Sequence, residues 1–142
     1  MLPSRLTAEQ VQKVARAHSE AEERCELEPL MATMVPEPVF EFHPPGARLV
    51  GGARIRRHYE QFIARFMPLV EGTELLSQCV NETASVQEYR IHLRIDGRRE
   101  THGVVAVLYA SDDRLGGERL YGSQRLLELM LGKMKAELEP LG

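Results

Sequence analysis

The stretch that decides the fold is VFEFHPPGARLVGGARIRRHYEQFIARFM, residues 39–67. Its first part, residues 39–43, alternates aromatic and polar side chains, which is the period of a half-buried strand. The Pro-Pro-Gly sequence at 44–46 ends strand pairing, because proline lacks the amide donor and glycine accepts a positive φ. We therefore expect His43 at the rim of a strand, beside a tight polar turn.

From Gly52 onward the same stretch has the period of a helix. Its apolar side chains recur at helical spacing and form one stripe, which comprises Ile55, Tyr59, Phe62, Ile63, Phe66 and Met67. Such a stripe must cover an apolar surface, so we expect this helix to lie back across the sheet. A neighbouring basic cluster is expected on a solvated helix face and comprises Arg54, Arg56, Arg57 and His58.

Two helical patterns precede this stretch. Thr7 and Gln10 have the spacing of a capping box, and they begin a helix that we expect at 8–23. The apolar stripe of that helix ends at His18, which places an imidazole where the helix meets the core. A second, shorter helix is expected at 27–35, because prolines follow directly.

After Pro68 the hydrophobic period changes from that of helices to that of strands. Asp96-Gly97 is a strong hairpin signal, since a type I′ turn needs a positive φ at two successive residues. A short final helix is expected around 126–131, with Gly132 as its stop. Four extended segments are predicted, at 71–81, 85–95, 100–111 and 114–121.

The order of these elements predicts one α+β domain spanning residues 1–142. We expect a cone-shaped, strongly curved antiparallel sheet with the helices packed on its concave face. On the strand at 85–95 one face is mostly polar and the other apolar. Tyr89 falls on the apolar face, whereas Glu88 and Arg90 fall on the polar one.

Composition argues against several classes of function. The formal net charge of −3 and the isoelectric point near 6.0 provide no overall basic field, so neither nucleic acid nor a membrane surface is an expected partner. Cys25 and Cys79 are too few and too far apart for a disulfide framework. With neither a signal peptide nor an apolar run of about 18 residues, we expect a cytoplasmic protein.

Four motifs carry a family resemblance: CELEPLMATMV, FEFHPPG, LVGGARIRRHYEQF and DRLGGERLYGSQRLLELMLG. In this order, between residues 7 and 132, they resemble the SnoaL-like polyketide cyclases and ketosteroid isomerases of the nuclear transport factor 2-like superfamily. The resemblance implies a cone with a ligand pocket, and a homodimer whose sheets pack back to back. That superfamily also includes epoxide hydrolases, dehydratases and non-catalytic binders, so the reaction stays open.

The resemblance also implies site residues. His43 stands where ketosteroid isomerases place the carboxylate that moves the proton. His18 falls near the position of the tyrosine that donates to the enolate oxygen. Ser123 occupies the place after the last strand where SnoaL-like cyclases carry an acidic residue.

Histidine chemistry is the basis of the expected mechanism. An imidazole titrates near neutral pH, so we expect His43 to act as a base. The donor to the ligand oxygen would be His18, Tyr59 or Tyr121. A purely structural role remains open for each histidine: His43 could be hydrogen-bonded to its turn, and His18 could be a packing residue.

The remaining candidates orient the base or contact the ligand. Glu41 or Glu118 would orient His43 and raise its basicity. No metal is expected, because the sequence has no HxH or HxxxH pair and the histidines lie on separate elements. The side chains expected to contact the ligand are Tyr59, Tyr121, Phe40, Phe62, Ser123 and His102, the last of which could instead be a solvated strand residue.

These residues support two functions and leave a third open. The first is a cofactor-independent isomerase, cyclase or hydro-lyase that acts on an apolar carbonyl or polyketide-like compound. The second is a non-catalytic protein that binds a small apolar or aromatic ligand in the same pocket. The third is an interaction module that recognises another protein through the outer face of its sheet.

Overall fold

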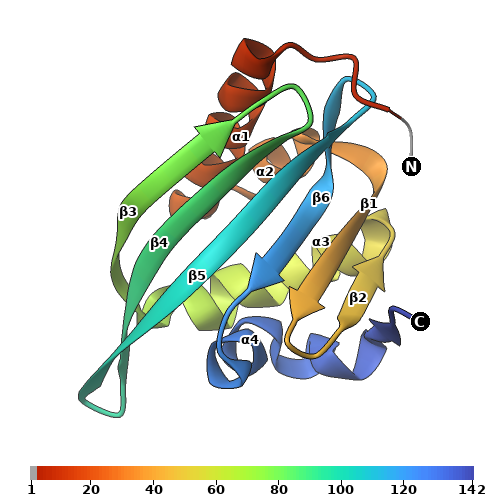
Figure 1. Ribbon diagram of the computed structural model, residues 1–142. Helices are drawn as coiled ribbons and strands as arrows, with labels where there is room; N and C mark the ends of the chain where they lie inside the picture. The colour runs from red at the N-terminus through yellow and green to blue at the C-terminus, as the bar shows by residue number, and fades with distance from the viewer. Residues whose placement is uncertain (1–2) are drawn as a thin grey trace.

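The computed structural model describes residues 3–142 and shows a curved sheet with its helices packed against one face (Figure 1). The helices are α1 (Ala8–Glu23), α2 (Leu27–Ala32), α3 (Gly52–Gln61) and α4 (Gln124–Leu131). The strands are β1 (Met34–His43), β2 (Ala47–Val50), β3 (Val70–Val80), β4 (Ala84–Ile95), β5 (Arg98–Ser111), β6 (Arg114–Tyr121) and β7 (Glu139–Pro140). The expected α+β architecture, with the helices on the concave face, is therefore confirmed.

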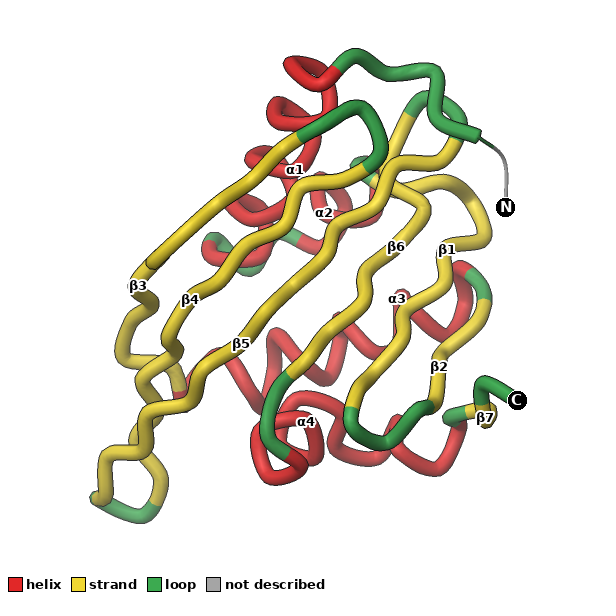
Figure 2. Tube along the Cα trace, in the orientation of Figure 1, coloured by secondary structure: helices red, strands yellow, loops and turns green. Residues whose placement is uncertain are grey.

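The strands form one open sheet in the order β3-β4-β5-β6-β1-β2-β7. The expected meander is present, since β3 to β6 pair with one another in antiparallel fashion (Figure 2). The sheet is nevertheless mixed, because β1 runs parallel to β6. This pairing joins residues that are far apart in the chain, such as Val39 and Gly117, with α3 and the other strands of the meander between them, so local periodicity does not reveal it.

Local signals place several boundaries correctly. The Thr7 hydroxyl accepts from the Gln10 amide and the Gln10 side chain accepts from the Thr7 amide, so the capping box is formed and α1 has the expected bounds. Asp96 and Gly97 have φ angles of 51° and 76°, which is the turn that the Asp-Gly pair predicts. Gly132 stands with φ 52° at the end of α4.

The region around the prolines differs from expectation. The second helix ends at Ala32 rather than near residue 35, and Pro36 and Pro38 lie inside β1. The pairing of β1 with β6 shifts register between Met34 and Val39, and such an irregularity accommodates residues that lack an amide donor. The strand β2, which pairs with β1 directly after the polar turn, was not predicted.

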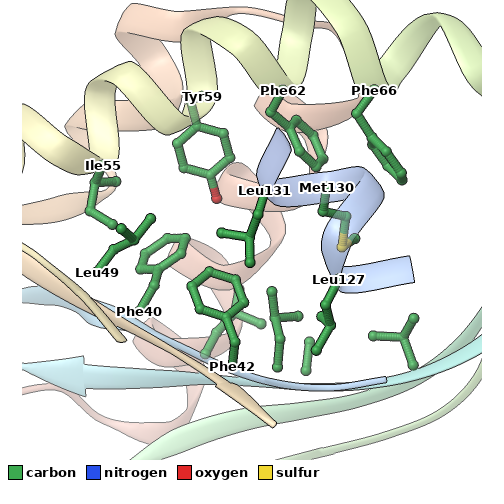
Figure 3. Close-up of a cluster of buried hydrophobic side chains, with 14 of the residues drawn as sticks. Phe40, Phe42, Leu49, Ile55, Tyr59, Phe62, Phe66, Leu127, Met130 and Leu131 are labelled. Atoms are coloured by element: carbon green, nitrogen blue, oxygen red, sulfur yellow. The ribbon is translucent and has the colours of Figure 1, made fainter. Parts of the chain in front are cut away.

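The core lies between α3 and the sheet, as Figure 3 shows. Tyr59 and Ile55 point down from α3 toward Phe40 and Phe42, which rise from β1, and all four side chains are buried. Helical periodicity continues beyond α3 in a π-helical turn, Phe62–Phe66, whose two phenylalanines are also buried. The apolar stripe therefore covers the sheet as expected.

One member of the basic cluster, His58, does not lie on the solvated helix face where it was expected. Arg56 and Arg57 lie on the solvent side, where they form ion pairs with Glu28 and Glu137. His58 instead is 3% exposed and packs among the aromatic rings of the core. Burial lowers the pKa of His58 to about 4, so this imidazole is neutral at neutral pH.

The two faces of β4 confirm the expected alternation. Ile91 and Leu93 are buried against the helices, whereas Glu88 and Arg90 are exposed on the outer face. Pairing of two copies through this outer face stays a prediction. Within residues 3–142, no helix combines the length and hydropathy that crossing a membrane requires.

Gly117 provides a test of the parallel pairing between β6 and β1. Its φ is +145°, and a Cβ built there would lie 1.9 Å from the Val39 carbonyl oxygen. We expect Gly117→Ala to lower the free energy of unfolding by about 3 kcal/mol, because backbone must move to relieve this overlap. Gly103→Ala is the matched control, since a Cβ at Gly103 of β5 meets nothing within 4 Å.

Urea denaturation of the two variants and the wild type measures this difference. Gly103→Ala should unfold within about 0.5 kcal/mol of the wild type, as surface substitutions usually do. Equal stability of the two alanine variants would contradict the close approach of β6 to β1.

Candidate active site

The candidate site begins with His18, which α1 holds on its buried face. The Nδ1 atom of His18 lies 2.8 Å from the Thr33 hydroxyl, and that hydroxyl donates its proton to the Leu30 carbonyl oxygen at 2.7 Å. Because the hydroxyl proton is already used, Nδ1 must carry a proton and donate to Thr33. The other ring nitrogen, Nε2, is thereby directed away from Thr33, toward the sheet and α3.

Three polar side chains surround Nε2 of His18. The Tyr59 hydroxyl oxygen lies 3.2 Å from it, a Glu118 oxygen 3.4 Å and a Glu22 oxygen 3.8 Å. The Tyr59 hydroxyl also donates to Glu22 at 3.3 Å. We refer to His18, Glu22, Tyr59 and Glu118 as the polar cluster. Its members come from α1, α3 and β6, so the tertiary fold assembles it.

Burial and charge act on this cluster together. Burial alone lowers the pKa of His18, but the hydrogen bond to Glu118 and the negative charges of Glu118 and Glu22 outweigh it, so the pKa rises above its usual value. Burial and the charge of Glu118 raise the pKa of Glu22 to about 7, although His18 and Tyr59 oppose that shift. The cluster therefore favours the protonated form of His18, and it holds a carboxyl group that is partly protonated at neutral pH.

A cavity of about 1000 Å³ opens next to this cluster, between α1, the π-helical turn after α3, and the inner faces of β3 and β4. Its walls are apolar at Phe62, Met67, Ile91 and Met130. This volume is at the upper end of the range of small-molecule sites. The cavity is therefore large enough for a polycyclic or long-chain compound.

A second, much smaller space of about 20 Å³ lies at the inner end of the site. Glu22, Tyr59 and Glu118 line it, and Glu22 and Tyr89 line both this space and the large cavity. A space of this size holds about one water molecule. A ligand in the large cavity therefore meets the polar cluster at Glu22, while His18 and Glu118 lie behind it.

The structure brings together only part of the expected site. His18, Tyr59 and Glu118 meet in the polar cluster, and Phe62 lines both spaces, whereas Phe40 belongs to the packed core. Glu118 approaches His18 rather than His43. The sequence had left open whether His18 is a packing residue, and its contacts place it in the polar cluster.

His43 does not reach this site, which corrects the expectation that it is the catalytic base. Strand alternation is the reason, because Phe40 and Phe42 face the core and their neighbours Glu41 and His43 face outward. The His43 ring stacks on Tyr121 with centroids 4.7 Å apart, and its Nε2 lies 3.4 Å from Glu41. Glu41 thus contacts His43 as expected, but on the outer face of the sheet.

His102 and Ser123 meet each other away from both spaces. The Nδ1 atom of His102 lies 3.0 Å from the Ser123 hydroxyl, and its Nε2 lies 3.0 Å from Glu100. The Ser123 hydroxyl also accepts from the Leu126 amide and so caps α4. These contacts give the two residues a role at the start of α4 rather than in the ligand cavity.

Sequence reasoning missed Glu22 and Tyr89 as site residues. Glu22 follows His18 by four residues, which places both on one side of α1 and was a usable signal. The strand alternation predicted Tyr89 on the apolar face of β4, and its hydroxyl group was the one feature that indicated a polar contact. The long-range positions of α1 and β4 decide that both residues border the cavity.

Among the described residues, His18, Glu22 and Glu118 also form a group that could hold a metal ion. One ligand atom from each lies within 4.8 Å of the others. Zinc accepts one imidazole and two carboxylates as ligands. The expectation that no metal binds considered only HxH and HxxxH pairs, whereas this group consists of one histidine and two glutamates. The same three side chains also contact one another and Tyr59 directly, through the ion pairs of His18 with Glu118 and Glu22 and the hydrogen bond from Tyr59 to Glu22.

The contact between Thr33 and His18 yields a prediction. Thr33→Val keeps the side-chain shape but removes the acceptor of the His18 Nδ1 proton, which leaves a buried donor unpaired. We expect the free energy of unfolding, measured in urea, to fall by about 1–3 kcal/mol. Thr101→Val is the matched control, because Thr101 makes the same kind of contact to His92 on the exposed surface. If both variants lost the same free energy of unfolding, the buried contact would stabilise the fold no more than the exposed one does.

Comparison with known proteins supports the fold. No protein-family model and no curated protein matches the sequence. Among solved structures, a ketosteroid isomerase-like protein from Kribbella flavida has 15% identity and a TM-score of 0.65, covering 82% of this chain and 80% of its own. An LEH-like epoxide hydrolase of M. tuberculosis has 20% identity and a TM-score of 0.64, covering 92% and 96%. Bal32a, from a soil-derived mobile gene cassette, has 13% identity and a TM-score of 0.70, covering 87% and 97%. Further similar structures are NTF2-like proteins, and the chain has the α+β curved-sheet fold of the nuclear transport factor 2-like superfamily.

Proposed function

We propose that this protein is a cofactor-independent acid/base enzyme that acts on a small, largely apolar carbonyl compound. The observation that carries this proposal is the position of Glu22, which is shared between the polar cluster and the large cavity. A carboxyl group in that position can exchange a proton with a ligand while the cluster supports its charge. Isomerisation, cyclisation and elimination of water are the reactions of this class.

The proposed step is proton transfer at the carbon next to the carbonyl group. The Glu22 carboxylate removes that proton, and the electron pair of the broken C–H bond moves to form an enolate. In an isomerisation the same carboxyl returns the proton to another carbon, so no proton is gained or lost overall. With a pKa of about 7, Glu22 populates the accepting and the donating form at neutral pH.

The other cluster residues have supporting roles in this scheme. Tyr59 donates to Glu22 and holds the carboxyl in place. His18 and Glu118 form a buried pair behind it, whose charges influence Glu22 from opposite directions. The proton transfer itself uses only the Glu22 carboxyl group, so this step requires no metal and no organic cofactor.

The similar structures support this proposal at the level of the fold. One is described as an isomerase of ketosteroids and another as an LEH-like epoxide hydrolase, and both descriptions belong to those proteins. What supports a related activity in this chain is its own buried cluster beside a cavity of suitable size. The polar groups exceed what packing of an apolar cone requires.

One observation favours a second candidate, a non-catalytic binder of an apolar ligand. The inner space holds about one water molecule, so His18 and Glu118 are closed off from a ligand in the cavity. In that case the polar cluster would stabilise the packing of α1 on the sheet, and ligand would bind without chemical change. Proton exchange with solvent distinguishes the two candidates.

Glu22→Gln tests the proposed enzyme. The probes are 1-tetralone and a β,γ-unsaturated steroid ketone, and NMR in D₂O follows exchange of the protons next to the carbonyl group. We expect wild-type exchange to rise with pH through about 7, because the accepting form of Glu22 is the carboxylate. Glu22→Gln should lower the rate by about 100-fold or more, since an amide cannot take up the proton.

Glu9→Gln is the matched control, because Glu9 is an exposed glutamate of the same helix that borders neither space. It should exchange at the wild-type rate. Exchange at the solvent rate with wild-type protein, or full exchange with Glu22→Gln, would contradict the proposed enzyme and favour the binder.

A further inference from the structure

Tyr89 is a cavity residue that the proposed proton transfer does not use. It lies on β4 in the inward register of Ile91 and Leu93, and it lines both the large cavity and the small inner space. Within residues 3–142 its hydroxyl group has no hydrogen-bond partner, and the side chain is half-buried. The accessible part of this side chain faces the cavity.

The other tyrosine of the site makes the contrast clear. The Tyr59 hydroxyl is occupied, because it contacts His18 and donates to Glu22. The Tyr89 hydroxyl borders the cavity instead, and a ligand that displaces water from it must replace the lost hydrogen bond, since an unpaired hydroxyl loses its hydration without compensation. The free hydroxyl of Tyr89 therefore has its donor available for a group that enters the cavity.

The protonation of Tyr89 fits a donor. Burial is the largest cause that raises the pKa of Tyr89 well above its usual value, and the charges of Glu22 and Glu118 act in the same direction. The phenol therefore keeps its proton throughout the range in which Glu22 titrates. It can donate a hydrogen bond but does not act as a base.

Charge in the cavity wall limits the kind of acceptor. Glu20, Glu22 and Glu23 of α1 border the cavity with a single arginine from that helix, Arg16. On β3, Glu71 also borders it, although it is ion-paired with arginine on the neighbouring strand. An anionic ligand would be repelled by this wall, so a neutral oxygen is the acceptor that it accommodates.

We propose that the Tyr89 hydroxyl donates a hydrogen bond to a neutral oxygen of the bound ligand, a ketone or an alcohol, and fixes that oxygen beside Glu22. The proposal rests on the proposed function for the location of the ligand, but not for any chemical change. Tyr89 is thereby a specificity-determining residue that selects oxygenated compounds over hydrocarbons and carboxylic acids.

The test uses three probes of similar shape: 1-tetralone, tetralin and 1,2,3,4-tetrahydro-1-naphthoate. Their dissociation constants are measured by NMR titration of the full chain at neutral pH. We expect the wild type to bind the ketone about tenfold more tightly than the hydrocarbon, and the carboxylate most weakly. In Tyr89→Phe the affinity for the ketone should fall to within twofold of tetralin, while the affinity for tetralin stays unchanged.

Tyr121→Phe is the matched control, since Tyr121 lies on the outer face against His43 and borders neither space. It should keep the wild-type preference. Unchanged tetralin binding by Tyr89→Phe shows that the cavity is intact, so a loss of ketone preference reports the hydroxyl group alone.

Three results would overturn the proposal: no preference of the wild type for the ketone, a preference that survives in Tyr89→Phe, or tightest binding of the carboxylate. None of them depends on turnover. If proton exchange by Glu22 fails while Tyr89→Phe loses its preference, the protein is a binder with an oxygen anchor. If exchange is present while the preference is absent, the enzyme positions its ligand by another group.

Discussion

The site depends on a buried imbalance of charge, in which two carboxylates and one imidazole share a small space. His18 is 1% exposed, and the side chains of Glu118 and Glu22 are 9% and 27% exposed. One imidazolium can neutralise the charge of one carboxylate. Burial of the second carboxylate as an anion then costs free energy, and protonation of that carboxylate removes the cost. Glu22 is the more accessible of the two, and it is the one whose pKa rises to about 7. Close packing of α1 and α3 on the sheet is what maintains this imbalance.

The fold connects this buried charge to the ligand space. β3 and β4 lie at one edge of the curved sheet (Figure 1). The cavity is lined by residues of these two strands, of α1 and of the π-helical turn after α3. The rings of Phe40 and Tyr59 pack against each other in the core between α3 and β1 (Figure 3), and Tyr59 also belongs to the polar cluster. Glu22 and Tyr89 lie where the two regions meet. A carboxyl group with a raised pKa and a hydroxyl group thus border the cavity, while His18 and Glu118 lie behind them.

Much of the fold follows from local signals in the sequence, because capping, hydrophobic period and turn chemistry act over a few residues. Thr7 begins α1, Asp96-Gly97 forms the hairpin, and the apolar stripe of α3 covers the sheet as expected. The parallel pairing of β1 with β6 could not be predicted, since it depends on contacts far apart in the chain. His43 shows the same limit in the site. Alternation separates its face from that of Phe42, and the burial of Phe42 in the core decides which face is inside. The i,i+4 spacing of His18 and Glu22 was visible, but its meaning required the position of Glu118 on a distant strand.

The central claim is that Glu22 is the proton-exchanging carboxyl group, and its own titration tests that claim most directly. The chemical shift of the Glu22 carboxyl carbon, followed by NMR across the pH range, reports this ionisation without any ligand. A midpoint at about 7 is the predicted result, because burial and the charge of Glu118 favour the protonated form. A midpoint near the ordinary glutamate value of 4.5 would contradict the account. It would mean that Glu22 is ionised throughout the neutral range and that the polar cluster does not tune it for proton transfer.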